Sequence, residues 1–475
     1  MILAIDQGTS ATKCLLVDRA GGIVARGSAS VGETHPRPGW VEQDATALWR
    51  SVQAAVAACL DGQDARAVAA VGIASQRESV VLWDAASGEP VTPLLSWQDQ
   101  RAAAVCDRLR GSEVEAMVRV RSGLPLDPMF SAAKASWLLD AHDPGRAHTR
   151  PGGWRLGTVD AWLLSRFGAE HLIEAGNASR TQLLDVARVR WDHELLDLFG
   201  VPAACLPRVV ASTGPFPAAR GLAPLPDGVP VLAVMGDSHA ALYAHGVRAP
   251  GQVKATYGTG SSVMGLLAAA DRVDPGLCLT IAWQSDHTAF AAEGNIRASG
   301  ATLRWLANLF GRTPEEISEL GAVNDNGGVA LVPGFTGLGA PWWDRHAVGL
   351  LANLRLDTAM PNLARAALDA VVHQVADVLE AFGDVDALFA DGGPTRSDAL
   401  MRMQADVLGI PVSRANDTEL SALGAAHMAG LGVGLWSEAE LAALPRARDV
   451  FRPGENDRMA ERGRWREAVA RARGR

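Results

Sequence analysis

The chain has 475 residues, of which 48% are hydrophobic and 20% are charged, and its formal net charge is -9 at pH 7. This length predicts about two or three domains, with enough apolar material for separate cores. The acidic balance argues against a nucleic-acid partner, because nucleic-acid binding needs a concentrated basic surface. No stretch of about 18 consecutive apolar residues occurs, so the sequence also predicts no membrane partner.

The cysteines and the N-terminal segment indicate the compartment. Five cysteines stand at positions 14, 59, 106, 205 and 278. Their number is odd and none has the spacing of a structural zinc site, so we expect reduced thiols. The first residues lack the basic segment and the cleavage site of a signal peptide, and their pattern is typical of a strand. Together these features predict a cytoplasmic protein.

The chain is predicted to begin with a β-hairpin, formed by residues 2–5 and 12–17 and followed by a third strand at residues 23–29. Its turn holds Asp6, Gly8 and Thr9. Glycine lets the backbone approach a ligand closely, and consecutive N–H groups in such a turn bind anions. Asp6 would supply a carboxylate for a magnesium shell. The same residues also fit an ordinary hairpin, and taken alone this short motif favours the ordinary hairpin.

A second group of polar residues follows a predicted buried strand at residues 71–74. Arg77 and Glu78 come just after this strand. Two adjacent charges at a strand end can clamp a polyhydroxyl substrate through charge-assisted hydrogen bonds. An exposed ion pair of little energetic consequence is the alternative. Helices are predicted at residues 44–60, with Asp44 as the N-cap, and at residues 101–110 and 132–139.

Asp237 is predicted to be the centre of the chain's chemistry. A buried strand at residues 229–235 ends in Gly236 and Asp237, and an alanine-rich helix follows. The carboxyl end of a strand is where open α/β sheets bind ligands. Asp237 also lies almost at the midpoint of the chain. We therefore predict that two half-chains close on this carboxylate and that it acts as a general base.

The second half of the chain repeats the first hairpin. Strands at residues 253–257 and 263–267 flank a turn with Gly258 and Thr259. The repeat is too short to prove a duplication, but it singles out both turns. Further on, a strand at residues 386–390 leads through Gly392 and Gly393 into a helix at residues 398–408. This arrangement accepts a phosphate or ribose, or is simply a helix-start turn. Other helices are predicted at residues 361–382 and 421–430, and a charged surface helix within residues 446–475.

In chain order, nine motifs resemble those of the FGGY carbohydrate kinases, and within that family they are most similar to those of the glycerol kinases. The motifs are Asp6-Gln7-Gly8-Thr9, Gln76-Arg77-Glu78, Gly157-Thr158-Val159-Asp160, Asn177-Ala178-Ser179-Arg180-Thr181, Gly236-Asp237, Thr256-Tyr257-Gly258-Thr259-Gly260, Pro333-Gly334-Phe335-Thr336-Gly337-Leu338, Asp391-Gly392-Gly393 and Ala422-Leu423-Gly424-Ala425-Ala426. Each motif is short, but together they span nearly the whole chain in the family's order.

The resemblance implies an α/β fold of two actin-like (ribonuclease-H-like) domains with a central cleft. Residues 1–246 would form the N-terminal domain, which binds the sugar or polyol and carries the catalytic base. Residues 247–475 would form the C-terminal domain, which binds ATP. The implied activity is phosphorylation of a hydroxyl group of a small polyol or sugar, with ATP and Mg²⁺ as cofactors. The resemblance is also compatible with a homodimer.

The resemblance further assigns roles to individual residues. Asp237 would be the catalytic base, and Asp6 and Asp237 would lie near Mg²⁺. The substrate-binding residues would be Arg77, Glu78, Trp97, Met129, Asp237 and Ser238. The nucleotide-binding residues would be Thr9, Ser10, Lys13, Gly258, Thr259, Gly260, Gly300, Gly392, Gly393 and Ser397.

Several positions depart from the glycerol kinase pattern. Lys13 stands where an arginine is usual, and Ser397 stands where an asparagine often contacts the adenosine. In the expected substrate pocket, Met129 replaces tyrosine, Ser238 replaces glutamine and Ser262 replaces phenylalanine. A site that loses a hydroxyl partner changes its discrimination strongly. We therefore expect a pocket with room for a four- or five-carbon polyol or ketose.

Three alternatives remain at this stage. The first is a pentulose kinase similar to the xylulokinases, against which the Arg77-Glu78 pair argues. The second is an actin-like ATPase without a sugar substrate, against which the polyol clamp before Trp97 argues. The third is an inactive homologue, which the presence of Asp6, Asp237 and the two turn threonines makes a poor fit.

Overall fold

The computed structural model describes residues 1–270, 273–323, 325–454 and 459–474. The chain divides into two compact units. The first unit comprises Met1–Gly246, Leu279–Phe290 and Glu419–Pro445, and the second comprises Val247–Cys278, Ala291–Thr418 and Arg446–Arg475. Two later segments of the chain thus pack with the first unit, although the sequence analysis placed them in the second. Within the described residues, no helix has the length and apolar character needed to span a membrane.

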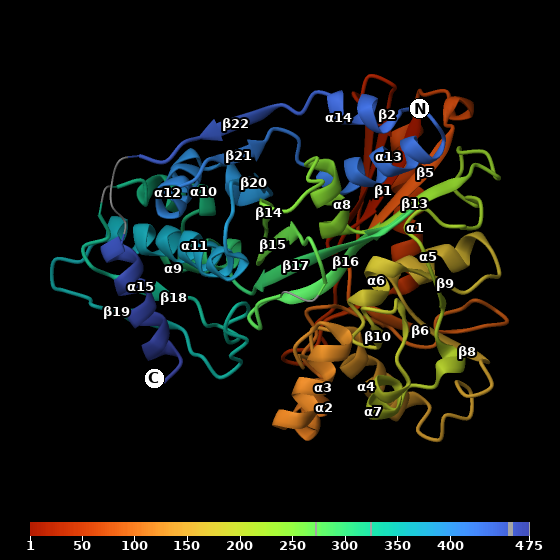
Figure 1. The fold of residues 1–475 in the computed structure, drawn as a ribbon, viewed down its shortest axis with the longest axis horizontal. Coiled ribbons are helices and arrows are strands. Elements are labelled where there is room, and N and C mark those ends of the chain that lie inside the picture. The colour runs from red at the N-terminus through yellow and green to blue at the C-terminus, as the bar shows by residue number, and fades with distance from the viewer. Residues whose placement is uncertain (271–272, 324, 455–458, 475) are drawn as a thin grey trace. The chain divides into compact units, whose positions relative to one another are not determined.

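The first unit is built on a five-stranded sheet with the strand order β13-β5-β1-β2-β3 (Figure 1). Its strands are β1 (Ile2–Gln7), β2 (Ala11–Val17), β3 (Ile23–Ser30), β5 (Ala70–Ser75) and β13 (Val231–Gly236). β1 pairs antiparallel with β2 and parallel with β5, and β5 pairs parallel with β13. The carboxyl ends of β1, β5 and β13 therefore lie at the same edge of the sheet.

Helices pack closely on this sheet. α1 (Ala45–Leu60) packs on β2 and β3, and it begins as predicted at Asp44, whose carboxylate accepts a hydrogen bond from Thr46 N. α13 (Leu420–Gly432) packs on β1, β5 and β13 and beside α8 (Asp237–Ala244). Glycines permit this approach: a Cβ at Gly72 of β5 would lie 2.3 Å from the carbonyl oxygen of Ala425. The small-residue helix predicted at residues 421–430 is confirmed.

The rest of the first unit contains a four-stranded sheet with the order β4-β7-β6-β8 and several short elements. The strands are β4 (Glu42–Gln43), β6 (Val80–Asp84), β7 (Leu94–Leu95), β8 (Trp154–Thr158), β9 (Leu172–Glu174), β10 (Leu184–Asp185), β11 (Arg190–Trp191) and β12 (Arg208–Val210). The helices are α2 (Ala103–Leu109), α3 (Ser112–Ser122), α4 (Ser131–His142), α5 (Val159–Phe167), α6 (Ala175–Ser179), α7 (His193–Phe199) and α14 (Glu438–Ala443), with 3-10 turns at Ala65–Ala67 and Ala203–Cys205.

The second unit contains the greater part of a sheet with the order β16-β17-β15-β14-β20-β21-β22 (Figure 1). β14 pairs antiparallel with β15 and parallel with β20, and β20 pairs parallel with β21. The order and directions of β15, β14, β20 and β21 repeat those of β2, β1, β5 and β13. The strands are β14 (Gln252–Tyr257), β15 (Ser261–Leu266), β16 (Cys278–Gln284), β17 (Thr288–Ile296), β20 (Ala387–Asp391), β21 (Val412–Ala415) and β22 (Arg448–Phe451).

Helix α11 (Met360–Phe382) forms the core of the second unit, since sixteen of its side chains, from Ala364 to Leu379, are buried. The other elements are α9 (Gly300–Phe310), α10 (Pro314–Leu320), α12 (Asp398–Leu408), α15 (Met459–Ala472), the small sheet of β18 (Ala330–Val332) and β19 (Leu350–Ala352), and a 3-10 turn at Gly393–Arg396.

The C-terminal segment differs from the single surface helix predicted within residues 446–475. It contributes the edge strand β22 and the helix α15, and part of the prediction, residues 455–458 and 475, lies outside the described residues. α15 is docked on α11 by two polar contacts to one carboxylate. Arg462 Nη2 donates to Asp377 Oδ1 at 2.7 Å, and Trp465 Nε1 donates to Asp377 Oδ2 at 2.7 Å. Trp465 and three alanine or valine neighbours on α15 are buried, so the helix has a packed face.

Candidate active site

A cation and carboxylates gather at the carboxyl edge of the first sheet. Asp6 lies near the end of β1, Arg77 follows β5, and Asp237 follows β13. The Arg77 Nε atom lies 3.3 Å from Asp237 Oδ1, and the Arg77 side chain is 6% exposed, whereas that of Asp237 is 35% exposed. The cation is thus fixed inside the protein, while the carboxylate keeps an open side for a ligand.

Glu78 is held in an uncommon conformation beside this pair. Its backbone φ is 62°, in the left-handed region, where non-glycine residues are strained. Arg180 Nε donates to Glu78 Oε1 at 2.6 Å, and both side chains are buried. Ser131 Oγ donates to the Glu78 carbonyl oxygen at 3.0 Å. Glu78 is therefore positioned by Arg180, to which the sequence analysis gave no role of its own.

Buried glutamines fix the turn that contains Thr9. Gln76 Nε2 donates to Gln7 Oε1 at 3.1 Å and to Gln43 Oε1 at 3.0 Å. Gln43 Nε2 donates to the Thr9 carbonyl oxygen at 2.6 Å, and the indole N–H of Trp97 donates to Thr9 Oγ1 at 3.0 Å. The turn is thereby tied both to the end of β5 and to Trp97.

Met129 sits in a loop that a buried lysine holds in place. The ammonium group of Lys134 donates to the carbonyl oxygens of Pro128 at 3.1 Å, of Phe130 at 3.2 Å, and of Met129. Burial lowers the pKa of Lys134 to about 8, and nearby carboxylates, led by Glu78, oppose this shift. Met129 itself is half-buried, so part of its side chain is open to a ligand.

The remaining predicted residues of the first unit lie near the same edge. Lys13 on β2 pairs in register with Asp6, and its charge partly opposes the rise that burial causes in the pKa of that carboxyl group. Ser238 donates a backbone hydrogen bond to Asp237 Oδ1 at 2.6 Å. Ser10 is exposed at the hairpin tip.

Asp6 and Asp237 fit a divalent cation. Burial, and next the Asp237 carboxylate, raise the pKa of Asp6 to about 7. The Oδ1 atom of Asp6 is buried and has no hydrogen-bond partner among the described residues. Those residues contain no group of three or more side chains arranged to hold a metal ion. Mg²⁺ commonly uses only one or two carboxylates, together with water and substrate phosphates, so these residues suit it.

The second unit contains a cavity of about 650 Å³, a volume suited to a small-molecule ligand. Five of the predicted nucleotide-binding residues line it, namely Gly258, Thr259, Gly300, Gly393 and Ser397. The turn and the start of α9 are joined by a hydrogen bond from Gly300 N to the Gly258 carbonyl oxygen at 2.9 Å. The hydroxyl of Ser397 accepts a hydrogen bond from Leu400 N at 3.3 Å and so caps α12.

Two predicted glycines, Gly260 and Gly392, are not among the residues that line this cavity. A Cβ at Gly260 would lie 2.2 Å from the Ile296 carbonyl oxygen. A Cβ at Gly392, where φ is +98°, would lie 2.0 Å from the Tyr257 carbonyl oxygen. Both glycines therefore allow close backbone contacts that shape the loops around the cavity.

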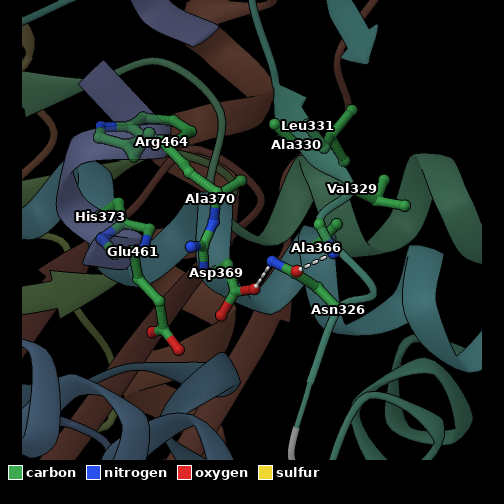
Figure 2. A pocket seen from close by; sticks show the side chains of 12 residues that line it. Asn326, Val329, Ala330, Leu331, Ala366, Asp369, Ala370, His373, Glu461 and Arg464 are labelled. Carbon is green, nitrogen blue, oxygen red and sulfur yellow. Dashed lines mark hydrogen bonds between the residues drawn. The ribbon is translucent and has the colours of Figure 1, made fainter. Parts of the chain in front are cut away.

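Figure 2 shows a much smaller cavity of the second unit, lined by residues of α11, α15 and β18. Asn326 Nδ2 donates to Asp369 Oδ2 at 2.8 Å beside it, and burial raises the pKa of Asp369. Its volume of about 20 Å³ has room for roughly one water molecule. Of these two cavities, only the larger can hold a nucleotide.

Sequence comparisons cover both halves of the chain. Residues 1–244 match the N-terminal domain, and residues 253–433 the C-terminal domain, of the FGGY family of carbohydrate kinases. The chain is 42% identical over 487 residues to the apulose kinase of Pectobacterium atrosepticum, covering 100% of this chain and 98% of the relative. It is 43% identical over 491 residues to the glycerol kinase of Aromatoleum aromaticum, covering 100% and 99% of the two chains.

Solved structures share the fold. The glycerol kinase of Plasmodium falciparum, solved with ADP, matches with a TM-score of 0.91 and 25% identity, covering 99% of this chain and 98% of that one. The xylulose kinase of Rhodospirillum rubrum matches with a TM-score of 0.86 and 24% identity, covering 98% and 97%. The fold and the site thus define a two-domain phosphotransferase of the actin-like class. The chain belongs to the FGGY family of carbohydrate kinases.

Membership confirms several predictions from the sequence. The protein has the actin-like α/β fold, and it is a carbohydrate or polyol kinase with ATP as the phosphoryl donor. Its partner is a small-molecule substrate.

Proposed function

We propose that the protein transfers the terminal phosphate of ATP to a hydroxyl group of a small polyol or ketose, with Asp237 as the general base. The observation that carries this assignment is the 3.3 Å approach of Arg77 to a carboxylate that remains 35% exposed. A base must reach the proton that it accepts, and its carboxylate must be held in a fixed position. Asp237 combines both properties at the ligand-binding edge of the sheet.

The substrate is proposed to lie in the first unit. Arg77 and Glu78 would bind its hydroxyl groups, and Trp97 and Met129 would contact its carbon chain. Ser238 would contact the hydroxyl groups from the first turn of α8. The fixed positions of Glu78, through Arg180, and of Met129, through Lys134, support this assignment, because a rigid site orients the reacting hydroxyl.

The nucleotide is proposed to lie in the second unit. Its site would be formed by Gly258, Thr259, Gly260, Gly300, Gly392, Gly393 and Ser397. From the first unit, the phosphates would be contacted by Thr9, Ser10 and Lys13. Asp6 and Asp237 would hold Mg²⁺, which when bound neutralises phosphate charge during transfer. The roles of residues 1–246 in substrate binding and of residues 247–475 in ATP binding are part of the same proposal.

We propose a substrate larger than glycerol. Two observations support this. The side chains at positions 129, 238 and 262 are smaller or less polar than those of the glycerol kinase pattern, and the chain is 42% identical to a relative named apulose kinase. Glycerol itself is the second candidate, because relatives named glycerol kinase are equally similar, with the one above at 43% identity.

A substrate screen tests the proposal. ATP consumption would be measured with glycerol, erythritol, xylitol, ribulose and xylulose, with and without Mg²⁺. We expect Mg²⁺-dependent turnover that is most efficient with a four- or five-carbon compound. Efficient turnover of glycerol alone would contradict the larger pocket, and ATP hydrolysis that no compound stimulates would favour the actin-like ATPase instead. A cytoplasmic location and a homodimer stay predictions.

A further inference from the structure

His239 lies on the first turn of α8, two residues after Asp237, and its side chain is fully buried. Its Nε2 atom lies 3.3 Å from Arg77 Nη1, and the same guanidinium group approaches Asp237 through its Nε atom. Arg77 is therefore held between the imidazole ring on one side and the carboxylate on the other. Gly236 makes room for this arrangement, since a Cβ there would lie 2.6 Å from Arg77 Cδ and 2.9 Å from His239 Nδ1.

The chemistry of the contact sets a condition on the imidazole ring. A guanidinium group can only donate, so Arg77 and His239 Nε2 share a hydrogen bond when Nε2 accepts and the ring proton lies on Nδ1. The same Nε2 atom lies 3.2 Å from Thr280 Oγ1, which in turn lies 2.9 Å from Ser179 Oγ. Ser179 directly precedes Arg180, which binds Glu78. The histidine thus joins the element that orients Glu78 to the element that carries Asp237.

We propose that His239 is a positioning residue for phosphoryl transfer: as a neutral acceptor it orients the Arg77 guanidinium toward Asp237 and the substrate. This inference rests on the proposed function of Asp237 as the base. It predicts that His239 acts through Arg77 and that its essential property is the hydrogen-bond acceptor at Nε2. A histidine that merely fills space in the core would instead act through volume.

Two substitutions separate the acceptor from the volume. His239→Gln keeps an amide oxygen that can accept from Arg77, whereas His239→Leu keeps bulk without an acceptor. We expect kcat/KM for the best substrate of the panel above to fall about 30-fold in His239→Leu and by about threefold or less in His239→Gln. The KM for ATP stays unchanged in both. Equal losses in the two variants, or no loss in either, would overturn the proposal. His171→Gln is the matched control. His171 lies in the same unit, with its ring edge-on to Trp83, and the variant should keep wild-type kinetics.

A double-mutant cycle tests the route of the effect. Arg77→Lys keeps the charge but lacks the planar fork that reaches both partners. If His239 acts through this fork, His239→Leu costs about threefold or less in the Arg77→Lys background, against about 30-fold in the wild type. The same 30-fold loss in both backgrounds would show that the histidine acts elsewhere. Melting curves of all variants check that they fold.

A measurement without substrate separates this inference from the proposed function. Nitrogen-15 NMR of the substrate-free, histidine-labelled enzyme reports which ring nitrogen carries the proton, and the resonance lost in His239→Gln assigns the residue. We expect the proton on Nδ1. A proton on Nε2 overturns the inference even if the kinase is active. If no compound of the panel is phosphorylated, the proposed function fails, while a proton on Nδ1 still supports the contact to Arg77.

Discussion

The two sheets have matching strand orders but carry different kinds of residue at the ends of their strands. β1, β5 and β13 of the first unit lead to Asp6, Arg77 and Asp237. In the second unit, β14 leads to Gly258 and Thr259, and β20 ends at the buried Asp391 and leads to Gly392 and Gly393. The first sheet thus presents charged side chains, which can bind a polar substrate and move a proton. The second has glycine-rich loops after its strands, whose backbones approach one another closely beside a cavity of about 650 Å³. In the proposed function, one scaffold supports chemistry in the first unit and nucleotide binding in the second.

The two hairpin turns show the same contrast. In the first unit, side chains hold the turn at Thr9, through Gln43 and Trp97. In the second unit, backbone groups hold the turn at Thr259, whose carbonyl oxygen accepts from Ser299 N at 2.9 Å and from Ala301 N at 3.0 Å. Substitutions in the first unit should therefore change the reaction rate, and substitutions in the second should change nucleotide affinity.

Replacing Asp237, the proposed base, should have the largest effect on the first unit. In Asp237→Asn the amide cannot accept the hydroxyl proton, so we expect kcat to fall about 10³-fold or more. The KM for ATP should change little, because the cavity of the second unit is untouched. Steady-state kinetics measure both. Asp44→Asn makes the same exchange at a helix N-cap, where either residue serves, and should retain full activity. Normal turnover in Asp237→Asn would remove Asp237 from the base role.

Asp6→Asn should separate catalysis from stability. If Asp6 helps to hold Mg²⁺, the variant loses about 100-fold in kcat at a fixed Mg²⁺ concentration. The free energy of unfolding of the variant should instead be higher than that of the wild type at alkaline pH. The pKa of Asp6 is raised from 3.8 to about 7 in the folded protein, so its contribution to stability is full below pH 3.8 and is lost as pH rises through 7.

The melting behaviour of Asp6→Asn tests that sign. At pH 8, without metal or nucleotide, the variant should be more stable than the wild type by up to about 4 kcal/mol, and the difference should vanish near pH 4. Denaturant unfolding at both pH values measures it. A variant that is less stable than the wild type at pH 8 would show that ionised Asp6 is not penalised in the folded protein.

Gly393→Ala tests whether the nucleotide binds beside this glycine in the second unit. A Cβ at Gly393 would meet no protein atom within 4 Å, yet Gly393 lines the large cavity. Any loss of ATP affinity would therefore report a clash with the nucleotide itself. We expect the KM for ATP to rise about tenfold, with kcat and melting temperature nearly unchanged. Gly463→Ala, also without steric neighbours but on α15, is the matched control. An unchanged KM in Gly393→Ala would move the nucleotide away from this loop.

Met129→Tyr tests how the first unit selects its substrate and should change only the preference among substrates. A larger side chain with a hydroxyl group should favour glycerol over five-carbon compounds, and we expect the ratio of their kcat/KM values to shift about tenfold. Met117→Tyr on α3 makes the same exchange away from the site and should leave the ratio unchanged. A ratio that does not move in Met129→Tyr would show that this side chain does not border the substrate.

Most elements were predictable from sequence because local signals agreed with the final packing. The helix predicted at residues 398–408 coincides with α12, and the strands of both hairpins lie within two residues of their predicted ends. β17 was missed because Glu293 and Asn295 look unlike strand residues. In the fold, Glu293 Oε1 accepts hydrogen bonds from Ser262 at 2.7 Å and from Asn295 at 3.0 Å, so tertiary contacts satisfy both.

The proposed site was predictable only as far as its motifs reach. Asp6, Arg77 and Asp237 were singled out because each follows a recognisable strand. The partners that orient them were not, because their contacts join distant parts of the chain. Arg180 and Glu78 are 102 positions apart, and His239 and Arg77 are 162 apart. Lys134 was missed because it lies inside a helix pattern, where a lysine usually faces solvent.

The packing of α13 on the first unit affects how the protein folds during synthesis. This helix covers β1, β5 and β13, yet it follows the last strand of that sheet by about 190 residues. At a synthesis rate of about 5–20 residues per second, the ribosome needs roughly 10–40 s to add them. During that interval the nascent sheet lacks its cover, so the growing chain offers an apolar surface to chaperones. A fragment ended at residue 246 would keep that surface permanently bare.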